Sequence, residues 1–272
     1  MKHKHIFLCI LISAMIFPSA FADITISSRT ESLLSELFQN RLSYAAEADG
    51  SKALKSLEDW VDGISAEMST FPEADKLVLT NMIDCVKYDQ MVRISGTKKE
   101  MIKLLSAQTK TTNAYMKAHK TEKMDKWLYL STGSVTSVYM ALEPLKTAMT
   151  YGYGVRDMWL EALKIDPNFS YAQRNLAQWY YYCPGFLGGS KKKARELFKS
   201  AYANSKSKSD SYETAILMSQ MCYEDKDKTK CEVYLKEAED LVSTNSAYIA
   251  FVRKINKEGE SIFKYHNHKA DQ

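Results

Sequence analysis

The chain has 272 residues, of which 45% are hydrophobic and 26% are charged, and it contains only 10 glycines and 5 prolines. This composition excludes the collagen-like, disulfide-dense and low-complexity classes of protein, and the length allows one large domain or two small ones. The 37 basic and 33 acidic residues give a net charge of +4. Bulk charge therefore points neither to nucleic acid nor to an anionic membrane as a partner.

The first segment has the pattern of a secretory signal peptide. Lys2 and Lys4 precede an apolar run at residues 6–17, and residues 20–22 form the small-x-small sequence that a signal peptidase reads. The run is shorter than the ~20 residues of a membrane-spanning helix, and no later stretch is long and apolar enough to span. We therefore expect a signal peptide at 1–22 and an exported protein without a membrane span, periplasmic or, alternatively, secreted. Its removal leaves a charge of 35 − 33 = +2.

Beyond residue 22 the chain has the pattern of an all-α protein. One stripe of apolar residues recurs at spacings of three and four, as in a helix: Leu54, Leu57, Val61, Ile64 and Met68. Proline disrupts a helix interior, and the remaining prolines all fall at breaks in the apolar pattern: Pro72, Pro144, Pro167 and Pro184. No convincing strand-like alternation is present, so the expected fold class is all-α.

Three segments repeat one pattern of three residues. The second, bulky residue comes four residues after the first, and the third, small residue comes three residues after the second. The sets are Val155, Trp159 and Ala162; Ala194, Phe198 and Ala201; and Cys231, Leu235 and Ala238. A second pattern precedes the middle set, with Leu176, Ala177 and Tyr180. Small residues at these positions let two antiparallel helices approach closely, and the bulky ones fill the gap to the next pair.

These residues resemble the tetratricopeptide repeat, in which helical hairpins of about 34 residues stack on one another. The likeness is best over about residues 151–241, and residues 127–139 look like another first helix. The resemblance implies a short solenoid of helical hairpins at 97–264. A divergent helical part at 23–96 then precedes the repeats, and a polar tail at 265–272 follows them.

The turn at 184–191, Pro-Gly-Phe-Leu-Gly-Gly-Ser-Lys, is similar to a loop of exported bacterial repeat proteins. Among these is the helical T-component associated with TRAP-type solute transporters. That resemblance implies an all-helical, non-enzymatic periplasmic accessory protein. The turn lacks the spacing of a phosphate-binding loop, so its glycines are interpreted as turn residues and Ser190 as the cap of the next helix.

The repeat resemblance also places a concave binding face on the first helix of each hairpin. Carried onto this sequence, the face comprises Trp127, Tyr171, Arg174, Gln178, Tyr181, Tyr182, Glu213 and Leu217. Arg174 beside tyrosines suits a grip on a carboxylate or a peptide backbone. The alternative is that the aromatic residues pack on neighbouring helices.

Four cysteines follow residue 22, and export would permit disulfides. Cys222 and Cys231 flank a polar turn between two predicted helices, and an unstrained bridge there would contribute ~2–3 kcal/mol. Alternatively, Cys231 takes the small core position of its repeat and stays reduced, or it is a reactive thiol. Cys85 and Cys183 are interpreted as buried thiols.

The sequence carries no recognisable nucleophile, metal-ligand or cofactor motif. We therefore expect a non-enzymatic binding protein, without metal or cofactor, that docks a protein or peptide on the concave helical face. The alternative is a periplasmic accessory protein that binds a small solute for a transporter. An enzyme is the third hypothesis, and it would need a buried polar cluster.

Overall fold

The computed structural model describes residues 23–242 and 246–265. The expected signal peptide, and all of the expected tail except Tyr265, lie outside the described residues. The described chain is all-α, and no residue in it belongs to a named strand. Its elements are α1 (Ser28–Ala46), α2 (Gly50–Ser69), α3 (Glu73–Met91), α4 (Lys98–Ala118), α5 (Lys126–Leu142), α6 (Pro144–Ile165), α7 (Ser170–Tyr182), the 3-10 helix η1 (Gly185–Leu187), α8 (Lys191–Asn204), α9 (Lys208–Glu224), α10 (Lys228–Asp240) and α11 (Ala247–Lys257).

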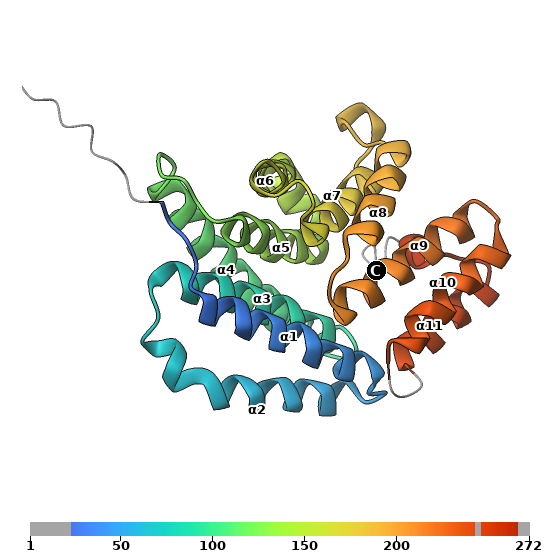
Figure 1. The fold of residues 1–272 in the computed structure, drawn as a ribbon, viewed down its shortest axis with the longest axis horizontal. Helices are drawn as coiled ribbons and strands as arrows, with labels where there is room; N and C mark the ends of the chain where they lie inside the picture. Colours follow the sequence, from blue (N-terminus) through green and yellow to red (C-terminus); the bar gives the residue numbers. More distant parts are fainter. Residues whose placement is uncertain (1–22, 243–245, 266–272) are drawn as a thin grey trace, which may run out of the picture.

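Three helical hairpins, α5–α6, α7–α8 and α9–α10, pack one on the next in a solenoid-like stack. Figure 1 shows α5 to α8 in the upper part of the molecule and α9 to α11 at one end. The repeated sequence pattern lies inside these hairpins. Tyr180 is half-buried, and every other member is buried: Val155, Trp159, Ala162, Leu176, Ala177, Ala194, Phe198, Ala201, Cys231, Leu235 and Ala238. The all-α fold of stacked helical hairpins is therefore confirmed.

A small residue permits the closest of these helix contacts. Trp159 of α6 lies directly over Gly133 of α5, and a Cβ at Gly133 would be only 2.5 Å from its indole nitrogen. Any larger residue at this position would have to push the two helices apart. The hairpin thus depends on the pairing of a bulky with a small residue, as the repeat pattern predicts.

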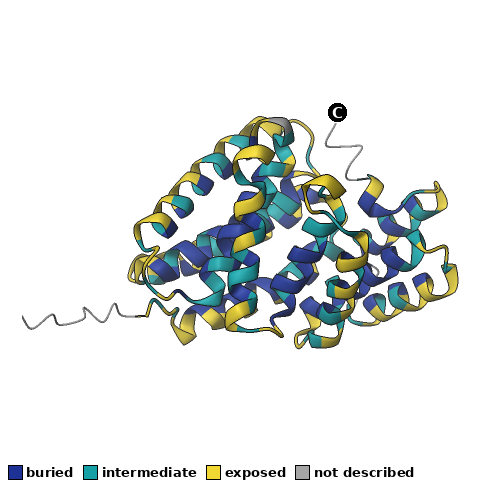
Figure 2. Ribbon diagram, turned by 90° about the horizontal axis from the view of Figure 1, so that it is seen from above, coloured by how far each residue is buried: buried dark blue, intermediate teal, exposed yellow. Residues whose placement is uncertain are grey.

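The helices of the N-terminal part pack together and against the hairpins. The buried Asp75 of α3 accepts hydrogen bonds from Ser27 and Thr30, which fix the start of α1 on α3. Ile24 forms a single bridge with Met124, just before α5. The expected boundary at residue 96 falls in the turn between α3 and α4, and α4 packs against both α3 and α5. Figure 2 shows buried residues on the inward faces of the helices and exposed residues on the outward ones.

The four prolines lie at helix starts or in turns, as expected. Pro72 precedes α3 and Pro144 is the first residue of α6. Pro167 and Pro184 lie in the turns before α7 and η1. Proline has no amide donor to lose at a helix start, which is why the chain tolerates it there.

Candidate functional site

The face expected to bind a partner is covered by the first helix of the same chain. Phe38 of α1 stacks on Trp127 of α5 and on Tyr171 of α7, with ring centroids 6.0 and 4.9 Å apart. One turn further, Leu42 is buried in the same apolar cluster as Leu217 of α9. The expectation of an open concave groove is therefore wrong at these positions, because α1 occupies it.

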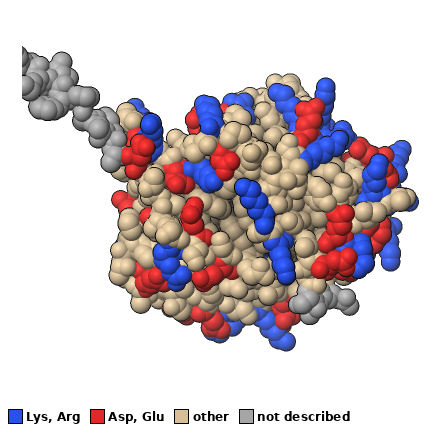
Figure 3. Space-filling model, in the orientation of Figure 1, with Lys and Arg blue, Asp and Glu red and all other residues tan. Residues whose placement is uncertain are grey.

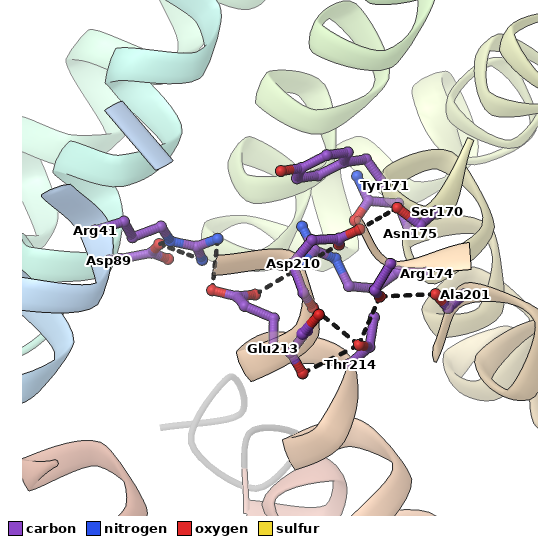
Figure 4. A network of polar contacts seen from close by, with 12 residues as sticks. Arg41, Asp89, Ser170, Tyr171, Arg174, Asn175, Ala201, Asp210, Glu213 and Thr214 are labelled. Carbon is purple, nitrogen blue, oxygen red and sulfur yellow. Dashed lines mark hydrogen bonds and ion pairs between the residues drawn. The ribbon is translucent and has the colours of Figure 1, made fainter. Parts of the chain in front are cut away.

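Arg174 points into the seam between the N-terminal helices and the hairpins. Its guanidinium pairs with Asp210 and Glu213 of α9, each at 3.3 Å, and its side chain is only 7% exposed. Glu213 also pairs with Arg41 of α1 at 2.6 Å, and Arg41 pairs with Asp89 of α3 at 2.7 Å (Figure 4). We call these five side chains the seam network. Arg174 is therefore not free to grip a partner, because carboxylates of its own chain already hold it.

Burial and the opposite charges of the seam network shift the pKa values of its side chains. Burial raises the pKa of Asp89 and of Asp210, and the guanidinium beside each opposes that rise. Burial disfavours the charge of Arg41, but the carboxylates of Asp89 and Glu213 outweigh it, so the pKa of Arg41 lies above its ordinary value. The two guanidinium groups face three carboxylates, one more than they can neutralise. Such a cluster stabilises the seam only while every partner is present.

The C-terminal segment packs on the next part of the expected face, although Tyr182 stays 37% exposed. The rings of Tyr181 and Tyr182 lie 4.5 and 6.3 Å from that of Phe263. The Nζ atom of Lys191 lies 4.9 Å from the Tyr181 ring centroid. Gln178 is half-buried, and its side chain makes no hydrogen bond with a described residue. This is the packing on neighbouring helices that the alternative interpretation of the aromatic residues predicts.

The four cysteines of the described residues are free thiols, so the possible Cys222–Cys231 bridge is not formed in the structure. Cys231 is buried in the first turn of α10. Burial, with a smaller contribution from Cys222, raises its pKa to about 11. This arrangement supports the alternative in which Cys231 takes the small core position of its repeat, and the high pKa argues against a reactive thiol. Cys85 and Cys183 are half-buried.

Sequence reasoning missed an exposed aromatic patch at the turn between α7 and α8. The side chain of Phe186 is 88% exposed, and Tyr153 and Leu187 beside it are 49% and 42% exposed. Arg156 lies over the rings of Tyr153 and Trp179, at 5.0 and 5.4 Å from their centroids. We call these five residues the turn patch. Its sequence signal is an aromatic–aliphatic pair between Pro-Gly and Gly-Gly, a framework that holds the pair outward.

The backbone around Phe186 is fixed by hydrogen bonds and by two glycines. The amide of Ser190 donates to the carbonyl of Tyr180 at 2.8 Å, and Ser190 caps α8 as expected, by accepting from the amide of Lys193. Gly188 has a φ of +96°, which favours glycine, and a Cβ at Gly189 would lie 1.7 Å from a carbonyl oxygen. The turn therefore presents Phe186 on a defined backbone.

A second feature is a cleft of about 230 Å³ between α4, α5 and α6. Five of its lining residues have polar side chains, namely Asn113, Thr132, Thr136, Thr150 and Tyr151, and two more are the glycines Gly133 and Gly154. Among the described residues, none that lines the cleft carries a charge. The sequence signal for this cleft is the set of small, mostly polar residues at 131–136 on α5.

Within the described ranges, no three His, Cys, Asp or Glu side chains gather as a metal site would require. None of the described helices combines the length and apolarity needed to cross a membrane. Figure 3 shows acidic and basic side chains interspersed over the face drawn. A comparison with protein-family models and with curated protein sequences finds no match.

Proposed function

We propose that this chain is an exported, non-enzymatic binding protein of the tetratricopeptide-like kind, and that a protein or peptide partner docks on the turn patch. One observation carries the proposal: Phe186 is 88% exposed on a backbone that hydrogen bonds hold in place. An ordered, exposed aromatic residue ringed by half-exposed apolar neighbours is the usual anchor of a protein interface. The concave face is a poorer candidate, because a partner there would first have to displace α1.

The charge around the turn suggests the chemistry of the partner. Lys191, Lys192 and Lys193 are exposed at the start of α8, and none forms an ion pair with a described residue. Arg156 adds a guanidinium beside Tyr153, although it pairs with its neighbour on α6. We therefore propose a partner segment in which an apolar anchor is flanked by acidic residues, because opposite charge steers and orients such encounters.

Site-directed photo-crosslinking in the native envelope tests the docking proposal. A photoreactive residue at Phe186 should crosslink a partner that the same residue at Val233 of α10 does not, since Val233 is apolar and 51% exposed but lies outside the turn patch. The purified partner should then bind Phe186→Ser at least about 10-fold more weakly than Val233→Ser. Equal crosslinking at both positions, or equal affinity of the two variants, would exclude the turn patch.

A second candidate function, binding of a small solute for a transporter, is supported by the cleft. The cleft is half-enclosed by three helices, and it provides polar groups beside an apolar floor of Val155 and Met158. Small-ligand sites between packed helices have this mixture of apolar walls and a few placed polar groups. This function does not depend on the turn patch, so the two proposals can fail separately.

A further inference from the structure

A buried layer of uncharged polar side chains runs between α3, α4 and α5 and ends at the cleft. Asn81 donates to Thr112 at 3.0 Å and to Ser131 at 3.2 Å. Gln108 donates to Asn81 at 2.7 Å. The hydroxyls of Thr112 and Thr132 lie 2.9 Å apart, and Thr132 lines the cleft. Every polar group in such a layer needs a hydrogen-bond partner, because an unpaired buried group lowers stability. An apolar core would carry no such requirement.

Hydrogen-bonding capacity is left over at the end of this layer. The Nδ2 atom of Asn113 donates to the carbonyl of Thr109 at 2.8 Å and to Thr136 at 3.3 Å, which leaves its Oδ1 atom and the Thr136 hydroxyl proton available. The hydroxyls of Thr150 and Tyr151, contributed by α6, bond to no described residue. One acceptor and three hydroxyls from three helices therefore line one cleft.

The size and charge of the cleft restrict what it can hold. Its volume of about 230 Å³ is below the roughly 300–1,000 Å³ of pockets for drug-sized ligands. A charged ligand in a half-enclosed site needs an opposite charge in the wall, and the described lining residues supply none. The adjacent Trp159 Nε1 atom is buried against Gly133, a lining residue, and has no hydrogen-bond partner.

We propose that the cleft binds an uncharged, polyhydroxylated small molecule of about the size of a monosaccharide or a polyol. Its hydroxyls would exchange hydrogen bonds with Asn113, Thr136, Thr150 and Tyr151, and its carbon face would lie on the apolar floor. The inference rests on the second proposed function, solute binding, and it is independent of docking at the turn patch.

Two variants separate ligand binding from folding. A Cβ added at Gly154, at the exposed edge of the cleft, meets no atom within 4 Å, so Gly154→Leu adds a bulky side chain there whose first atom has open space around it. Gly63→Leu is its control, because Gly63 is also helical, exposed and unobstructed but lies on α2. Thr136→Val removes one cleft hydroxyl at nearly constant volume, and Thr214→Val does the same at a buried site on α9.

The assay is ligand-observed NMR and calorimetry on the purified full chain. The neutral probes are glucose, ribose, myo-inositol and glycerol, and the charged probes are gluconate, glutamate and lysine. We expect a neutral probe to bind the parent chain. Its affinity should be at least about 10-fold lower for Gly154→Leu and for Thr136→Val, and unchanged for the two control variants. If only a charged probe binds and Gly154→Leu abolishes it, solute binding stands and the ligand class is wrong. If no probe binds at 10 mM, or if Gly154→Leu binds like the parent chain, the cleft is not a solute site and both proposals fail.

Discussion

The seam and the turn patch are built from the same kinds of side chain and end in opposite environments. In both, an arginine lies over a tyrosine ring, at 5.1 Å for Arg174 over Tyr171 and 5.0 Å for Arg156 over Tyr153. The Arg174 side chain is 7% exposed beneath α1, whereas that of Arg156 is 29% exposed. The difference shows that aromatic and basic composition does not identify a binding surface, because a distant part of the same chain can cover it.

Ion pairs, as well as apolar contacts, hold α1 over the seam. The seam network supplies carboxylates from α3 and α9 to both of its arginines. At the turn, the three lysines that begin α8 have no such partner among the described residues. A surface whose charges are already paired within the chain gains little by binding a partner, because those pairs would first have to be broken.

The largest difference between the two regions is expected when one phenylalanine is truncated in each. Phe38→Ala should lower the free energy of unfolding by about 3–5 kcal/mol, because the ring is 96% buried (4% exposed) between α1 and two first helices. Phe186→Ala should change it by less than about 0.5 kcal/mol, because the ring is exposed. Urea unfolding measures both. Equal losses for the two variants would contradict the assignment of a closed seam and an open patch.

A somewhat smaller effect is expected from the seam network. Arg174→Ala should cost about 2–4 kcal/mol, because it leaves the buried Asp210 without its guanidinium partner and leaves Glu213 with Arg41 alone. The control is Arg195→Ala, which breaks an exposed pair with Asp225 and should cost less than about 1 kcal/mol. Chemical denaturation at neutral pH compares the two. A loss below 1 kcal/mol for Arg174→Ala would mean that the carboxylates find other partners and that the seam is not locked by charge.

The smallest effect on stability is expected from Asp84, a buried carboxyl on α3. Burial raises the pKa of Asp84 to about 7, and Lys87 opposes this only in part. The folded state therefore keeps a proton that the unfolded state releases, so stability falls as the pH rises from about 4 to 7. Asp84→Asn should weaken this dependence and, at pH 8, should be more stable than the parent chain by at least about 2 kcal/mol. Unfolding curves at pH 5 and pH 8 test it, and an unchanged slope with pH would show that Asp84 ionises freely.

Much of the hairpin architecture was predictable because its signal is local. The four-then-three spacing of bulky and small residues, and prolines that fall only at breaks in the apolar pattern, report helix packing within about forty residues of chain. The cap at Ser190 was predictable for the same reason, since a capping hydroxyl bonds to an amide three residues away. Arg174 and Tyr171 do lie on the first helix of a hairpin, as predicted. They differ from the prediction in facing other helices of the chain and not an open groove.

Three features follow from local sequence: the all-α class, the paired helices with their buried small and bulky residues, and the glycine framework of the turn. Each depends on neighbours close in the chain. The position of α1 on the concave face follows from long-range packing, since Phe38 meets Tyr171 and Arg41 meets Glu213 across more than a hundred residues. Long-range packing also makes polar side chains of three helices converge on one cleft. Such contacts follow from how whole helices pack, and no local spacing encodes them.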